Sequence, residues 1–139
     1  MRAIDLKEVF KGIVAKFNAS TDLKNSVSGL YAYQAPANAT FPYIILTMQG
    51  NIPWDTMGEG PSGEGILVQF SIFSNKFPDA GEAMNILKLL TGAYDEAVIS
   101  MSGYTSLRMK RQGGTYLIGQ PMDGLFHAPV RYVLTVQKV

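Results

Sequence analysis

The stretch Gly65–Gly92, GILVQFSIFSNKFPDAGEAMNILKLLTG, joins a strand to a helix and decides the fold. Apolar residues occupy every second position of its first half, which is typical of a strand with one buried face. They are Ile66, Val68, Phe70 and Ile72. Apolar residues recur at helical spacing in the second half, so one stripe of a helix can cover that strand. Pro78 and the pair Asp79/Glu82 mark the change, because acidic residues satisfy the free N–H groups of a helix start.

A second helix and several strands complete the expected fold. We expect the helix over residues 5–17, where apolar positions follow an Asp5/Glu8 capping pair, and a polar, turn-rich segment over 18–28. Strands are expected over residues 29–34, 42–50, 97–101, 104–112, 115–119 and 129–138. Gly113-Gly114 predicts a hairpin between two of these strands, and the segment 121–124 predicts the next turn.

This order of elements predicts an α+β fold. We expect a mixed, mostly antiparallel β-sheet with two α-helices packed on one face. The 139 residues are enough for one core, so we expect a single domain over 1–139.

The composition indicates a surface that is short of charge. Charged residues make up 17% of the chain, against about 25% in an average protein, which favours self-association. The net charge of +1 gives no bulk attraction to nucleic acid or anionic lipid. Charges interrupt the apolar residues of the first 17 positions, and no apolar run has the length of a membrane span. We therefore expect a protein made in the cytoplasm, with no membrane partner.

No group of residues predicts catalysis or metal binding. The chain has no cysteine and one histidine, His127, which we interpret as a structural residue near the start of a strand. The paired carboxylates are explained by helix capping, and no serine lies in a Gly-x-Ser-x-Gly motif. We expect no catalytic residue, no metal site and no enzyme activity.

The segment 51–64, NIPWDTMGEGPSGE, predicts a long loop. Loops of more than about a dozen residues are uncommon in compact domains and are usually functional or disordered. Its Trp54 is a candidate anchor for a partner, although a tryptophan that folds back onto its own domain explains it equally well. Asp55, Glu59 and Glu64 make the loop acidic, and Asp55 and Glu59 are further interface candidates.

Three glycines in the same loop are spaced as in a dinucleotide-binding fingerprint. They are Gly58, Gly60 and Gly63. The fingerprint must follow a strand closely and open a helix, whereas here Pro61 intervenes and a strand comes next. We therefore expect no bound cofactor.

Arg108, Lys110 and Arg111 form the one basic concentration. Alternation places Arg108 and Lys110 on the same outward face of a strand. One interpretation is a solvated strand edge protected from aggregation. The other is a basic strip that faces a polyanion, a channel or the acidic loop of a neighbouring subunit.

Leu67 and Phe73 lie on the otherwise polar face of the 66–72 strand, and Val133 lies on the corresponding face of the last strand. Single exposed apolar residues need no explanation. If the sheet brings them together, they form an apolar patch on the face without helices, which is a candidate subunit interface.

With its elements in this order, the chain resembles the tail-completion or tail-terminator proteins of long-tailed bacteriophages. The resemblance rests on the N-terminal helix and on four stretches that span nearly the whole chain. They are GLYAYQAPANATFPYIIL (29–46), LVQFSIFSNKFPDAGEAMNILKLL (67–90), TSLRMKRQGG (105–114) and VRYVLTVQ (130–137).

The resemblance implies a structural protein of the virion, at the head-proximal end of the tail. Its subunits are expected to form a hexameric ring that caps the tail tube, ends tail elongation and joins tail to head. The implied partners are further copies of the chain, the tail tube protein, the head-neck connector protein and DNA passing through the channel.

Two other functions stay open from the sequence. A head-closure or neck connector protein has similar size and also forms rings. A small-ligand regulatory module would instead use a pocket between helices and sheet near Gly50 and Gly65.

Overall fold

The long strands β2, β3 and β7 form the centre of the sheet in the computed structural model, which describes residues 5–54, 63–106 and 108–138. The helices are α1 (Leu6–Ala19), α2 (Thr21–Ser26) and α3 (Gly81–Tyr94). The strands are β1 (Leu30–Ala32), β2 (Tyr43–Trp54), β3 (Gly63–Ser74), β4 (Tyr104–Ser106), β5 (Lys110–Gln112), β6 (Ile118–Gln120) and β7 (Leu125–Lys138).

The sheet is mixed and mostly antiparallel. Its order is β1-β2-β3-β7-β4, and β5 and β6 also pair with β7. Only the pairing of β1 with β2 is parallel among the described strands. The predicted α+β class is therefore confirmed.

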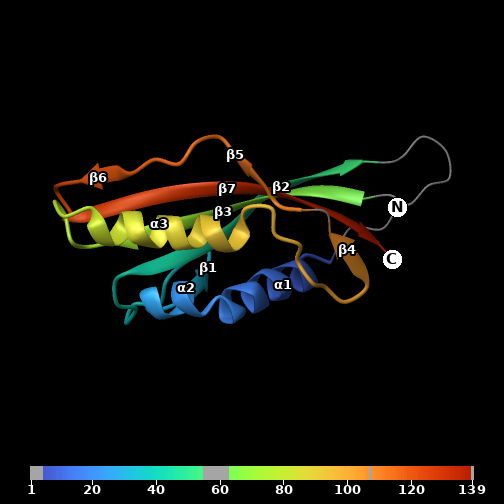
Figure 1. Cartoon of the computed structure of the whole chain (residues 1–139), viewed down its shortest axis with the longest axis horizontal. Helices are drawn as coiled ribbons and strands as arrows, with labels where there is room; N and C mark the ends of the chain where they lie inside the picture. Colours follow the sequence, from blue (N-terminus) through green and yellow to red (C-terminus); the bar gives the residue numbers. More distant parts are fainter. Residues whose placement is uncertain (1–4, 55–62, 107, 139) are drawn as a thin grey trace.

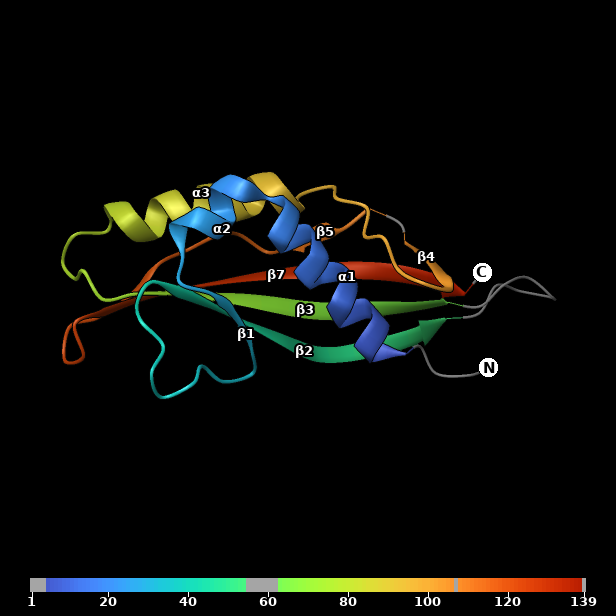
Figure 2. The ribbon, with the colours of Figure 1, turned by 90° about the horizontal axis from the view of Figure 1, so that it is seen from below.

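The helices cover one face of the sheet (Figures 1 and 2). Alternate residues of the long strands, such as Phe70, point into a core shared with Ile13 of α1 and Leu90 of α3. The ring of Phe70 lies 4.6 Å from that of Tyr94. The Tyr94 hydroxyl donates a hydrogen bond of 2.8 Å to the backbone oxygen of Ile13, which joins α3 to α1. Apolar burial on this face supplies most of the driving force for folding.

The helix starts differ in how well the sequence predicts them. Asp5 caps α1 as predicted, because its Oδ1 accepts a hydrogen bond from Lys7 N at 3.0 Å. At the start of α3, Asp79 Oδ1 accepts a hydrogen bond of 2.9 Å from Gly81 N, as predicted, but the N-cap position is Ala80 and Glu82 does not complete a capping box. Glu82 instead accepts from Ser74 Oγ at 2.8 Å and pairs with Lys76 at 3.0 Å.

Residues 21–26, predicted as part of a polar turn-rich segment, form α2. Leu23 is its buried residue, and α2 contacts both α1 and α3. Tertiary packing of one leucine therefore overrides the turn-rich composition.

The predicted loop over 51–64 is wrong at both ends, because residues 51–54 belong to β2 and residues 63 and 64 to β3. Pro53 pairs with Glu64 in this extension. In the described structure β1 ends opposite Leu46, so β2 has a strand neighbour on one side only beyond this point. A proline is tolerated there because its missing N–H can face the unpaired side.

The strands of the C-terminal half differ from the predicted ones. Residues 97–101 form no strand apart from a bridge between Met101 and Tyr104, and the predicted 104–112 strand is split into β4 and β5. The hairpin predicted at Gly113-Gly114 is wrong, since β5 and β6 each pair with β7 and not with each other. The reason is the length of β7, whose outer edge accommodates short strands in succession.

The predicted turn at 121–124 is confirmed and joins β6 to β7. Asp123 N donates to Gln120 O at 3.1 Å, and Gly124 has a φ of 67°, a value that glycine adopts without strain. Because this hairpin forms, β7 begins at Leu125, four positions before the predicted start. Among the described helices none is long and apolar enough to cross a membrane.

Candidate interaction surfaces

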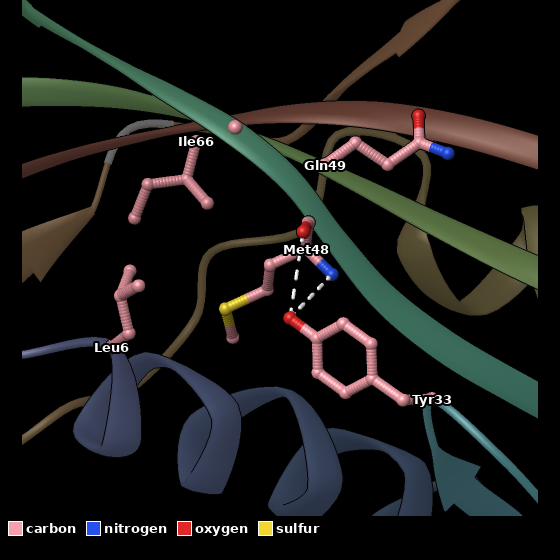
Figure 3. Close-up of a pocket in the computed structure, with 6 residues that line it drawn as sticks. Leu6, Tyr33, Met48, Gln49 and Ile66 are labelled. Atoms are coloured by element: carbon pink, nitrogen blue, oxygen red, sulfur yellow. Dashed lines mark hydrogen bonds between the residues drawn. The ribbon is translucent and has the colours of Figure 1, made fainter.

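A pocket of about 220 Å³ lies between the start of α1 and the outer edge of β2 (Figure 3). It is lined by Leu6, Tyr33, Met48, Gln49, Gly50 and Ile66. Ile66 is fully buried, whereas Leu6 is 41% exposed. The pocket lies beside Gly50, one of the two glycines that the sequence associates with a ligand pocket.

Tyr33 lines this pocket and forms hydrogen bonds with the edge of β2, where a neighbouring strand would otherwise pair. Its backbone N donates to Leu46 O at 3.0 Å, and its hydroxyl lies 3.3 Å from Met48 N and 3.4 Å from Met48 O. These bonds satisfy the edge of β2 just where β1 ends. The ring itself stays 61% exposed, so it presents an apolar surface to solvent.

An apolar groove of about 470 Å³ adjoins the pocket and shares Leu6, Tyr33 and Met48 with it. Phe10 and Ala32 extend its apolar lining. Lys7 and Lys11 also line it and are exposed. We call this surface the edge groove.

A second surface lies on the sheet face that the helices leave open. Here Tyr43, Phe73, His127 and Ile118 are register partners on four consecutive strands. Phe73 stacks on His127 with ring centres 4.6 Å apart and lies 5.5 Å from Tyr43. Tyr31 of β1 extends the row, since its ring lies 6.1 Å from that of Tyr43. We call these side chains the aromatic row.

Polar side chains separate the aromatic row from the next apolar residues of the open face. Gln69 Oε1 accepts from Gln49 Nε2 at 2.9 Å and from Arg131 Nε at 3.0 Å. Gln69 Nε2 donates to Ser71 Oγ at 2.8 Å. The network links β2, β3 and β7 and fixes the orientation of these side chains.

Leu67 lies beyond this network, opposite Val133 in the register. The sheet therefore brings Leu67 and Val133 together as the sequence suggested. Phe73 belongs instead to the aromatic row, because Gln69 and Ser71 lie between it and Leu67 on the same face of β3. The open face thus has two apolar areas rather than one patch, and their interface role stays a prediction.

The three basic candidates lie beside two acidic residues that end α3. Lys110 Nζ pairs with Glu96 at 2.6 Å, and Arg111 lies 3.5 Å from Asp95. Arg108 donates to the backbone oxygen of Glu96 at 3.3 Å. These contacts offset much of the positive charge within one subunit. The role of the strip at a channel or interface stays a prediction.

The candidates of the acidic loop are only in part within the described structure. The backbone of Trp54 lies in β2 opposite Gly63, not in a loop. Asp55 and Glu59 lie outside the described residues. The roles given to these three residues stay predictions.

Buried titratable groups have structural surroundings. Burial raises the pKa of Tyr94 and of Tyr132, and the Tyr132 hydroxyl also donates to Asp95 Oδ1 at 2.6 Å. Burial lowers the pKa of His127, whose Nε2 has no hydrogen-bond partner in the described part of the chain. Over the described ranges, no group of three His, Asp or Glu residues is placed to hold a metal ion.

Sequence reasoning missed the edge groove and most of the aromatic row. Leu6 lies in α1, Tyr33 directly follows β1 and Met48 lies in β2, so no sequence spacing connects them. The aromatic row could be found only from the register, although Tyr31, Tyr43 and Phe73 stand on predicted strands or next to them. Met122, the most exposed large apolar side chain among the residues whose burial the structure describes, lies in a turn that the sequence does predict.

Neither a protein-family model nor a curated protein sequence matches the chain. Solved structures do resemble its fold. A chain from the virion of a native gene transfer agent particle aligns with a TM-score of 0.69 at 9% identity, over 90% of this chain and 91% of that one. A second solved chain, whose name describes no function, aligns with a TM-score of 0.60 at 10% identity, over 99% of this chain and 97% of the other. At these identities the comparisons show a shared fold.

Proposed function

We propose that the chain is a structural subunit of a phage-like virion. The observation that carries this proposal is the likeness to a chain of a gene transfer agent virion over 90% of one chain and 91% of the other. Such coverage means that the whole fold, and not a shared fragment, is alike. Exposed apolar surfaces on the open face and at the edge groove agree with a subunit that works by contacting other proteins.

The finer proposal is a tail terminator. Subunits form a hexameric ring that caps the tail tube at its head-proximal end, ends tail elongation and joins tail to head. A closed ring requires complementary surfaces and no catalytic residue or cofactor. The low charged fraction of 17% supports self-association, and the resemblance to tail-terminator proteins in sequence pattern points to the same role.

Tube growth in vitro tests this role. Purified tail tube protein from the same phage or prophage is polymerised with and without the chain, and tube lengths are measured by negative-stain electron microscopy. We expect substoichiometric amounts of the chain to shorten the tubes and to appear as a cap at one end. Tubes of unchanged length with bare ends would contradict the terminator role.

A head-closure or neck connector protein is the nearest alternative. It would bind the head-side connector and leave tube growth unchanged. Pull-down with each purified partner separates the two, since a terminator binds the tube end and a head-closure protein does not.

The pocket beside Gly50 favours a small-ligand module as a second class of function. Its volume of about 220 Å³ lies below the roughly 300–1,000 Å³ of most ligand pockets, so with its polar Gln49 it suits only a very small molecule with one polar group. A thermal shift of several degrees with one member of a metabolite panel would support this function. The virion proposal predicts no such shift.

A further inference from the structure

The β6–β7 hairpin presents an apolar tip that the fold does not use. We define the hairpin tip as residues 118–124. Ile118 is 38% exposed and Met122 is 97% exposed, although each belongs to an ordered hairpin. Hydrogen bonds from Asp123 N to Gln120 O and from Gly124 N to Pro121 O, of 3.1 and 3.3 Å, hold the turn. The fold therefore presents Met122 to solvent on a pre-organised turn.

The hairpin tip matches the edge groove in shape and chemistry. The groove is a concave apolar surface formed by Leu6, Phe10 and Met48, and its volume of about 470 Å³ exceeds that of a methionine side chain. A flexible thioether fills irregular apolar space well. The tip is a convex turn that exposes the apolar side chains of Ile118 and Met122, so it can fill the concave apolar groove.

The charges of the two surfaces are also complementary. Lys7 and Lys11 line the edge groove, and Lys11 has a 3.5 Å contact with the partly buried Glu8. The hairpin tip has Asp123 as its charged residue and contains no basic residue. Insertion of Met122 would bring Asp123 toward the groove lysines. Such rim charges increase association rate and fix orientation.

The two surfaces lie on opposite edges of the sheet and toward opposite ends of the molecule (Figure 1). The edge groove involves β1, β2 and the start of α1, whereas the tip joins β6 to the start of β7. One subunit can therefore use both surfaces at the same time with two different neighbours. Contacts of this heterologous kind close into rings where the rotation between neighbours closes, and otherwise give open filaments.

We propose that the hairpin tip of one copy inserts Met122 into the edge groove of a neighbouring copy, with Asp123 facing Lys7 and Lys11. This contact rests on the proposed function, for which it supplies the subunit interface.

Mixing two variants tests the contact. Leu6→Glu damages the groove and leaves the tip intact, and an acidic residue suits the first turn of α1. Met122→Glu damages the tip and leaves the groove intact. We expect each variant alone to associate at least 100-fold more weakly than wild type. The equimolar mixture should give a 1:1 dimer and nothing larger, because only one tip–groove pair remains. Native mass spectrometry measures these species.

A matched control separates this contact from a general effect of surface charge. Met84 of α3 is 58% exposed and lies outside both surfaces, so Met84→Glu should assemble as wild type does. Exchanging the charges of the hairpin tip and the edge groove provides a second test. Asp123→Lys should weaken assembly about tenfold, and combining it with Lys7→Glu and Lys11→Glu should restore most of the loss.

The outcomes distinguish this contact from the function on which it rests. Wild-type rings that Leu6→Glu and Met122→Glu leave intact would overturn the contact and leave the terminator proposal standing. A mixture without the 1:1 dimer would also overturn the contact. Wild-type protein that forms no oligomer, free or on tail tubes, would overturn both proposals.

Discussion

The side chains on the two faces of β3 and β7 have different roles. On the helix-covered face, residues such as Phe70 and Tyr132 are fully buried and form one core with the helices. On the open face, the aromatic row and the Gln69 network are only partly covered, except for Ser71, which is buried. Alternation therefore divides each strand into a set of side chains that stabilises the fold and a set that stays available for partners.

The largest expected loss of stability is at Phe70 of β3, and a much smaller loss is expected at Phe73 of the same strand. Phe70→Ala should lower the free energy of unfolding by about 3–5 kcal/mol, because it removes a fully buried ring and leaves a cavity. Phe73→Ala, on the open face, should cost about 1 kcal/mol, the order of an aromatic pair contact. Urea unfolding of both variants provides the measurement. Equal losses would show that the open face is part of the core.

A hydrogen bond inside the core gives the next effect. Tyr94→Phe should cost about 1–2 kcal/mol, because it removes the buried bond to Ile13 O. Burial raises the pKa of Tyr94, so the folded protein retains a proton that the unfolded chain loses. Stability from this group is present below about pH 10 and falls as the pH rises above it. Tyr94→Phe should flatten the alkaline limb of the stability curve. An unchanged limb would contradict this assignment.

The pH dependence of stability tests the burial of His127 on the open face. Burial lowers its pKa in the folded protein, so the unfolded chain binds the proton more tightly. Its contribution to stability is present above about pH 6.5 and is lost as the pH falls below that value. It is the only histidine, so His127→Phe should keep the stacking on Phe73 and remove this pH dependence. Thermal unfolding between pH 5 and 8 measures it, and identical profiles for both proteins would count against the assignment.

The smallest effect is expected at the basic strip. Lys110→Met should change stability by no more than about 1 kcal/mol, because Lys110 and Glu96 form an exposed ion pair. Glu96→Gln serves as the matched change of the partner. A loss of several kcal/mol in either variant would show that the pair belongs to the core.

The sequence predicts the elements of this fold better than their pairing. The alternation at Ile66–Ile72 and the helical spacing before Tyr94 correctly predict β3 and α3, because local periodicity reflects which face is buried. The ends of β2 and β3 were missed because Pro53 and the nearby glycines suggest a loop. Strand neighbours depend on contacts distant in sequence, so the pairing of β5 and β6 with β7 could not be read locally.

The candidate sites show the same limit. Leu67 and Phe73 were assigned to the correct face by alternation, but only the register separates them into two areas. Leu6, Tyr33 and Met48 meet through the packing of α1 against the edge of β2, which no periodicity contains.

We propose that the chain works as a ring-forming subunit. The native mass of the purified protein over a range of concentrations, with negative-stain images of the largest species and of tail tubes mixed with the protein, tests it most directly. The expected result is closed rings of six subunits with a central hole, free in solution or at one end of each tube. A monomer at every concentration, with no ring on any tube, would contradict it.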